Sequence, residues 1–161
     1  MNGATQRRRA PSVPPAVVLA DSADLPGLSQ LLSGAIPRCS PLTVSDLPWS
    51  WPGYVLVRSD DRPVAAGSLQ PNPDLSYEVR GLVVDETAQG QGLGRRVMDH
   101  LVATADRRGA DLVCVTRVPQ FFARFGFMET TPDWLPPQRR GPDFDRAERV
   151  AMRRAPRGVA A

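Results

Sequence analysis

The stretch VVDETAQGQGLGRRVMDH, from Val83 to His100, combines a strand pattern with a helix pattern. Apolar β-branched residues give way to a polar turn, and three glycines then alternate with other residues at Gly90, Gly92 and Gly94. Two arginines and a helical pattern follow. The stretch therefore predicts a strand, a loop and a helix, with bare backbone where the helix begins.

Three interpretations compete for this loop. A dinucleotide fingerprint needs the spacing G-x-G-x-x-G, but the spacing here is G-x-G-x-G. A P-loop needs a lysine, and the chain has none. The third interpretation is a turn whose free amides bind a diphosphate, because the first N–H groups of a helix lack partners and glycine lets an anion approach. Arg95 and Arg96 would add positive charge. From the loop alone, a plain glycine-rich turn remains the alternative.

Composition limits the function classes. The 161 residues suit one domain, and a pI of about 9.5 favours anionic ligands only weakly. All 20 basic residues are arginine, without a known nucleic-acid-binding pattern. Cys39 and Cys114 lack metal-site spacing, so we expect reduced thiols in a cytoplasmic protein. No apolar run has membrane-spanning length, and we expect neither a membrane nor a nucleic-acid partner.

Periodicity predicts alternating strands and helices in one domain at residues 16–155. Residues 1–15 are expected to form a disordered basic tail, and residues 156–161 a loose end. The expected strands are residues 16–21, 54–59, 64–70, 76–84, 111–116 and 148–154. The expected helices are residues 22–36 with Ser22 as N-cap, residues 93–108 with Gly109 as C-cap, and a short helix from Pro119 to Gly126. Leu93, Val97, Leu101 and Ala105, with Met98 and Val102 beside them, form the apolar stripe of the long helix.

The loop and the stretch after the next strand carry a family resemblance. Gln89, Gly92 and Gly94 form the pattern Q-x-x-G-x-G, and FFARFGF follows at residues 121–127. In this order the motifs resemble the GCN5-related N-acetyltransferase (GNAT) superfamily, over residues 16–154. The resemblance implies an α/β fold with a mixed, mostly antiparallel sheet, splayed between its fourth and fifth strands and flanked by helices.

The resemblance also implies acetyl-coenzyme A (acetyl-CoA) as co-substrate, with no metal. Its pantetheine arm would lie between the splayed strands, and its diphosphate on the loop amides. The implied cofactor-binding residues are Leu82, Val83, Val84, Gln89, Gly90, Gln91, Gly92, Leu93, Gly94, Arg95 and Phe122. Many superfamily members carry, where Phe122 stands, a tyrosine that protonates the leaving thiolate. Phenylalanine cannot do so, so either another group serves or the thiolate leaves unassisted.

A narrower resemblance is to the short, stand-alone form of the N-acetylglutamate synthase acetyltransferase domain. The family's Leu-Pro and basic pattern before an aromatic-x-Arg stretch is matched by Leu135, Pro136, Arg139, Arg140, Phe144 and Arg146. Glutamate is therefore the leading acceptor, although residues 38–51 match poorly. Two alternatives stay open: an acetyltransferase that inactivates an amino-acid-like antimetabolite, and a non-catalytic acyl-CoA sensor or partner-binding module. The expected partner is a small-molecule amine, and a homodimer is compatible with the sequence.

Glu78 and three arginines are the candidates for chemistry on the acceptor. Glu78 stands where many family members place the base that deprotonates the ammonium group, and a carboxylate suits that task. Its alternative role is an ion pair with a neighbouring arginine. Arg80, Arg117 and Arg146 are the expected substrate-binding residues, because arginine binds carboxylates bidentately. Arg80 could instead neutralise Glu78, and exposed surface charge is the alternative for Arg117 and Arg146.

Overall fold

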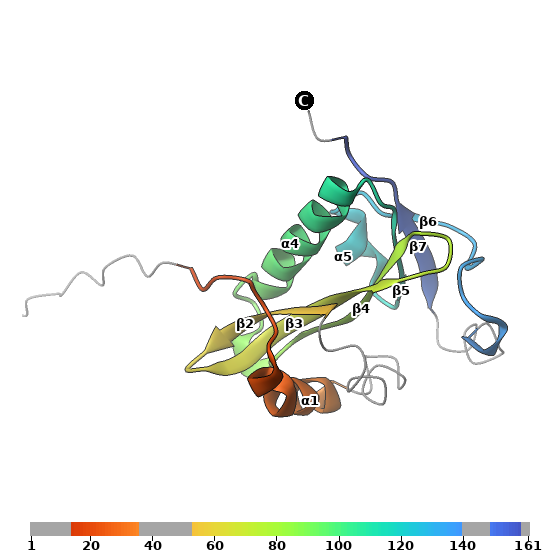
Figure 1. Ribbon diagram of the computed structural model, residues 1–161. Helices are drawn as coiled ribbons and strands as arrows, with labels where there is room; N and C mark the ends of the chain where they lie inside the picture. The colour runs from red at the N-terminus through yellow and green to blue at the C-terminus, as the bar shows by residue number, and fades with distance from the viewer. Residues whose placement is uncertain (1–13, 36–52, 140–148, 159–161) are drawn as a thin grey trace, which may run out of the picture.

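The computed structural model describes residues 14–35, 53–139 and 149–158. Within these ranges the chain forms one open, seven-stranded sheet with helices on both faces (Figure 1). Most of the expected disordered tail at residues 1–15 lies outside the described residues, and so do residues 159–161 of the expected loose end.

The strands follow the predicted order, with one addition. Their order across the sheet is β1-β2-β3-β4-β5-β7-β6, and only β4 and β5 pair in parallel. The mixed, mostly antiparallel sheet is thereby confirmed. The strands are β1 (Val18–Leu19), β2 (Tyr54–Ser59), β3 (Arg62–Pro71), β4 (Tyr77–Val84), β5 (Leu112–Thr116), β6 (Met128–Glu129) and β7 (Val150–Arg154). Strand β6 was not predicted, because two residues are too few for an alternation of apolar and polar residues to be visible.

The long helix has its predicted bounds, whereas the first helix begins at Leu25 and not at Ser22, and the short helix ends at Ala123 and not at Gly126. The helices are α1 (Leu25–Gly34), α4 (Leu93–Arg108) and α5 (Pro119–Ala123), with 3-10 turns η1 (Ser22–Asp24), η3 (Glu86–Ala88) and η4 (Pro137–Arg139). Gly109 adopts the left-handed conformation expected of a C-cap, with φ +63°.

Two predictions at the N-terminal end were wrong. The first strand is only two residues long instead of six, because the chain leaves the edge of the sheet and turns at Asp21. The capping residue is Asp21, which caps the turn η1 ahead of α1, and not Ser22: Asp21 Oδ1 accepts the N–H of Ala23 at 2.8 Å, and Asp24 accepts the N–H of Asp21 at 2.9 Å. These reciprocal bonds form a capping box, which leaves Ser22 inside the turn.

The sheet separates two hydrophobic layers (Figure 1). On one face α4 and α5 cover a large cluster, in which the predicted stripe of α4 is buried at Leu93, Val97, Met98, Leu101 and Ala105. On the other face α1 covers a smaller cluster that includes Tyr54, Leu56, Ala66 and Val83. None of the helices in the described ranges has the length and apolarity that crossing a membrane requires.

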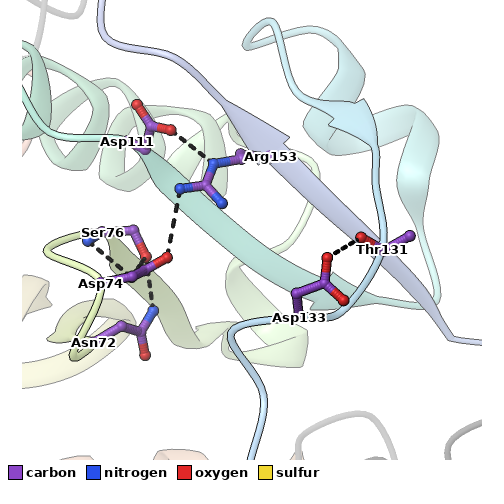
Figure 2. A network of polar contacts seen from close by, with 7 residues as sticks. All are labelled: Asn72, Asp74, Ser76, Asp111, Thr131, Asp133 and Arg153. Atoms are coloured by element: carbon purple, nitrogen blue, oxygen red, sulfur yellow. Dashed lines mark hydrogen bonds and ion pairs between the residues drawn. The ribbon is translucent and has the colours of Figure 1, made fainter.

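Polar contacts join β4, β5 and β7 at one end of the sheet (Figure 2). Arg153 of β7 donates to Asp111 at 2.7 Å, just before β5, and to Asp74 at 3.5 Å, in the turn before β4. Asp74 also accepts the backbone N–H and the hydroxyl of Ser76. These contacts join the two parallel strands at the end where the strands pair.

Candidate active site

The two parallel strands separate soon after they begin. Pairing between β4 and β5 is limited to Tyr77 with Leu112 and Glu78 with Val113. Beyond these pairs lies a cavity of about 570 Å³. The predicted splay between the fourth and fifth strands is therefore confirmed, and its opening forms the candidate site.

A bulge in β4 shapes one wall of this cavity. Ser68 of β3 pairs with Arg80, but Ala66 pairs with Val83, so two residues of β4 stand opposite Gly67. Gly81 has φ +59°, and a Cβ there would overlap the Tyr54 hydroxyl. A bulge interrupts the regular ladder, and the two bulged residues, Gly81 and Leu82, both line the cavity.

The bulge also changes which side chains face which layer. Val79 packs into the α4 cluster, and after the bulge Leu82 and Val84 do so as well. Without the extra residue, strand alternation would send Leu82 and Val84 to the opposite face. Tyr77 packs against the α4 cluster too, so it faces away from Glu78, as expected for adjacent strand residues.

The glycine loop ends in an open helix N-terminus. Gly90 has φ +77° and Gly92 φ +76°, and an added Cβ at either would meet no atom within 4 Å. Gly92 is the N-cap of α4 and makes no side-chain capping bond. The first amides of this 16-residue helix are thus without an intrahelical partner. A loop with this geometry fits a bound diphosphate.

The predicted cofactor-binding residues divide into two groups. Leu82, Val83, Val84, Gln89, Gly94 and Phe122 line the cavity. Gly90, Gln91, Gly92, Leu93 and Arg95 belong to the loop and helix start but do not line it, and the Leu93 side chain is buried in the core. Leu93 therefore has only its backbone to offer a ligand.

The aromatic wall includes a residue that the sequence did not single out. Phe122 is buried and packs edge-on against Phe121 and Phe127, with ring centroids 5.2 and 5.5 Å apart. Phe121 lines the cavity beside it. Since phenylalanine carries no hydroxyl, this wall supplies apolar surface and no proton.

Arginines gather at the acceptor end. Of the predicted substrate residues, Arg80 and Arg117 line the cavity, whereas Arg146 lies outside the described residues. Arg139 and Arg149 line it as well, although neither was a predicted site residue. Burial lowers the pKa of the Arg149 guanidinium, and the like charges of Arg117 and Arg139 lower it further.

Glu78 also lines the cavity, and it is paired. Its side chain is buried, and Arg139 donates to both of its carboxylate oxygens, at 2.8 and 2.7 Å. The ion pair that was the alternative role for Glu78 is therefore present. The arginine that holds both oxygens belongs to η4 and is 61 residues away in the sequence.

Residues 28–127 match the family model described as the Acetyltransferase (GNAT) family. The chain belongs to this family. It is an acetyl-CoA-dependent N-acetyltransferase, which confirms the resemblance in the loop and in FFARFGF. In the described residues, no group of three or more His, Cys, Asp or Glu side chains could hold a metal ion.

Solved structures share the fold of this acetyltransferase. N-acetylglutamate synthase from Neisseria gonorrhoeae, in complex with coenzyme A and N-acetyl-glutamate, is 21% identical with a TM-score of 0.76. That match covers 92% of this chain but only 36% of the synthase, so the chain spans about a third of that protein. A Mycobacterium tuberculosis protein in complex with CoA is 22% identical, with a TM-score of 0.70. The match covers 88% of this chain and 99% of the M. tuberculosis chain.

A third solved structure also shares the fold. A GNAT family N-acetyltransferase from Escherichia coli, in complex with CoA, is 17% identical with a TM-score of 0.67. The match covers 91% of this chain and 84% of that one. At these identities the likeness shows the fold, and the acceptor has to be argued from the residues of the cavity.

Proposed function

We propose that this acetyltransferase acetylates the α-amine of a small dicarboxylic amino acid, and that glutamate is its acceptor. The observation that carries the proposal is the charge of the cavity. Four arginines line it in the described residues, Arg80, Arg117, Arg139 and Arg149, and Glu78 is the one carboxylate among them. Each carboxylate of an acceptor needs a charge-assisted partner when it leaves water, and four guanidinium groups against one carboxylate give the lining of this cavity a net positive charge.

The lowered pKa of Arg149 supports an anionic acceptor. Its causes are burial and the nearby charges of Arg117 and Arg139. Guanidinium groups that repel one another gain when an anion enters between them. We expect Arg146 to add a further carboxylate contact, although it lies outside the described residues.

The proposed mechanism assigns the first proton transfer to Glu78. An ammonium group cannot attack a carbonyl until it loses a proton, and Glu78 takes that proton directly or through one water. The neutral amine then forms the C–N bond, and the C–S bond of the thioester breaks. The amide nitrogen gives up a second proton to solvent, the thiolate takes one from solvent, and Glu78 passes the first proton on to solvent, which restores the carboxylate. One proton is released overall.

The backbone of β4 and the glycine loop supply positioning. In this proposal the amides at the start of α4 hold the diphosphate, and β4 from Leu82 to Val84 binds the pantetheine arm by backbone hydrogen bonds, as an added strand would. The bulge at Gly81 lies beside the thioester carbonyl. Phe122 gives no proton, so the thiolate leaves without help from that position. The free, buried thiol of Cys114 suits the cytoplasm, where we place the reaction.

Thiol release from acetyl-CoA, measured over a panel of amines, tests the proposal. We expect kcat/KM for glutamate to exceed that for glutamine and for alaninamide by at least about tenfold, since one unpaired buried charge costs on that scale. Arg80→Ala and Arg117→Ala should raise KM for glutamate and leave KM for acetyl-CoA unchanged. Arg124→Ala, an exposed arginine outside the cavity, is the matched control.

Two outcomes would overturn the proposal at different depths. Equal kcat/KM for all three amines would show that glutamate and other dicarboxylic amino acids are not the preferred acceptors. Acetyl transfer itself would stand, and an acetyltransferase that acts on antimetabolites would then be favoured. Tight acetyl-CoA binding without turnover of any of the three amines would mean that the acceptor belongs to another chemical class.

A further inference from the structure

The contact between Arg139 and Glu78 occupies the atoms that the reaction needs. Arg139 Nη1 donates to Oε2 at 2.8 Å, and Nη2 donates to Oε1 at 2.7 Å. The side chain of Arg139 is 20% exposed and that of Glu78 is 5% exposed, so water competes little for either group. A proton that arrives on either oxygen of Glu78 breaks one of these two charge-assisted bonds.

Glu78 is therefore blocked as a base in this state. If the Arg139 side chain moved away from Glu78 and found no other partner, the carboxylate of Glu78 and the guanidinium of Arg139 would both be left unpaired, which is strongly unfavourable. A bidentate guanidinium–carboxylate pair can, however, exchange its carboxylate for another of the same geometry. A second carboxylate in the cavity is such a substitute.

We propose that the carboxylate of the acceptor draws Arg139 away from Glu78 and so frees the base only when a carboxylate-bearing substrate is bound. This inference rests on the proposed function, in which Glu78 is the base and the acceptor carries carboxylates. It makes Arg139 a positioning residue that acts through Glu78. Acceptors with and without a carboxylate then differ in kcat as well as in binding affinity.

The surroundings of the pair favour this exchange. Arg80, Arg117 and Arg149 line the same cavity, so an incoming anion is attracted before it meets Arg139. Arg139 is the last residue of the short turn η4, and its long side chain can change partner without moving a strand. An amine without a carboxylate offers Arg139 no alternative, and it meets a base whose oxygens are both engaged.

The decisive experiment compares Arg139→Gln with the wild-type protein on alaninamide, an acceptor without a carboxylate. We expect kcat for alaninamide to rise at least fivefold in the variant, while kcat/KM for glutamate falls. Arg149→Gln, which alters another arginine of the same cavity, should raise KM for glutamate and give no gain with alaninamide. The gain should disappear in the double variant Glu78→Gln with Arg139→Gln. An unchanged or lower kcat for alaninamide in Arg139→Gln would overturn the inference.

A second measurement needs no variant, which matters if Arg139→Gln does not fold. Glutarate added to the wild-type protein supplies the missing carboxylates, and we expect it to raise turnover of alaninamide at least threefold before it inhibits. Glutarate that only inhibits would overturn the inference. NMR without acetyl-CoA gives a readout besides activity: the Nε–H signal of Arg139 should shift on addition of glutarate, and a signal that stays in place contradicts the exchange.

The proposed function and the exchange at Arg139 can be refuted separately. If the wild-type protein does not acetylate glutamate, the proposed function is wrong, and the exchange at Arg139 falls with it. If glutamate is acetylated but neither Arg139→Gln nor glutarate increases turnover of alaninamide, only the exchange is wrong.

Discussion

Substitutions of Gly92 can distinguish the effect of backbone strain on acetyl-CoA binding from the effect of charge. The φ of Gly92 is +76°, which few residues with a side chain adopt, although a Cβ would have open space around it. We expect Gly92→Asp to weaken acetyl-CoA binding by about a thousandfold, because its carboxylate would repel the diphosphate at the start of the helix. Each factor of ten in affinity corresponds to about 1.4 kcal/mol. Calorimetric titration of acetyl-CoA measures this loss.

Two controls identify the cause of that loss. Gly92→Ala carries the backbone strain without the charge, and its effect should be much smaller. Gly109→Asp has a similar φ of +63° and open surroundings, but it lies at the other end of α4. It should lower stability and leave the affinity unchanged. An equal loss of affinity in both aspartate variants would mean that the loop is not the diphosphate site.

Among the elements, β4 carries most of the site, and its bulge depends on Gly81. A Cβ at Gly81 would overlap the Tyr54 hydroxyl and lie 2.8 and 2.9 Å from two carbons of that ring, at φ +59°. We expect Gly81→Ala to destabilise the protein by about 2–4 kcal/mol, through strain and overpacking together. Urea denaturation followed by circular dichroism measures the change in the free energy of unfolding.

The matched control lies in α1. Gly34 is the last residue of α1, and a Cβ there would meet no atom within 4 Å. Gly34→Ala should leave stability unchanged or raise it slightly, by up to about 1 kcal/mol. If the two alanine variants unfold at the same urea concentration, the bulge tolerates a side chain, and the clash with Tyr54 is relieved by a small movement.

At the scale of the whole molecule, Asp106 links α4 to the last strand. Arg154 is buried and donates to both oxygens of Asp106 at 2.7 and 3.0 Å. This hydrogen-bonded contact lowers the pKa of Asp106 below its usual 3.8, against the effect of burial, and the Arg157 backbone N–H lowers it further. A carboxyl group whose pKa is lower in the folded state stabilises the fold above the unfolded pKa, and it loses that effect as the pH falls through the folded value.

Asp106→Asn should therefore show a pH-dependent loss of stability. Near neutral pH we expect a loss of about 3–5 kcal/mol, the usual range when a buried charge loses its partner. The difference from the wild-type protein should start to shrink as the pH falls below 3.8, where the unfolded carboxyl group takes up a proton, and should go on shrinking until the pH passes the lowered pKa of the folded state. Urea midpoints at neutral and acidic pH test this. A difference that stays constant down to pH 3 would show that the pair contributes through packing and not through charge.

Local sequence determined most of the elements. The apolar stripe of α4, its C-cap at Gly109 and the strands from Tyr54 to Thr116 all follow from patterns within a few residues, and the structure confirms them. Patterns fail where a contact decides between neighbours, as at Asp21 and Ser22, because either side chain could have capped the turn. The glycine loop and its order relative to FFARFGF were sufficient to predict the family and the splay of the sheet.

Only the tertiary structure decided how the acceptor end is arranged. The sequence predicted Glu78 as a site residue and left a pair with an arginine open, but the partner that holds both of its oxygens is 61 residues away. Arg149 directly precedes β7, which pairs with β5, and Arg139 contacts Glu78 of β4, so two arginines far from Glu78 in the sequence line the same cavity. Periodicity records which face of an element is buried, but it contains no information about which distant charges meet. Side-chain contacts across the sheet therefore decide the partner of Glu78.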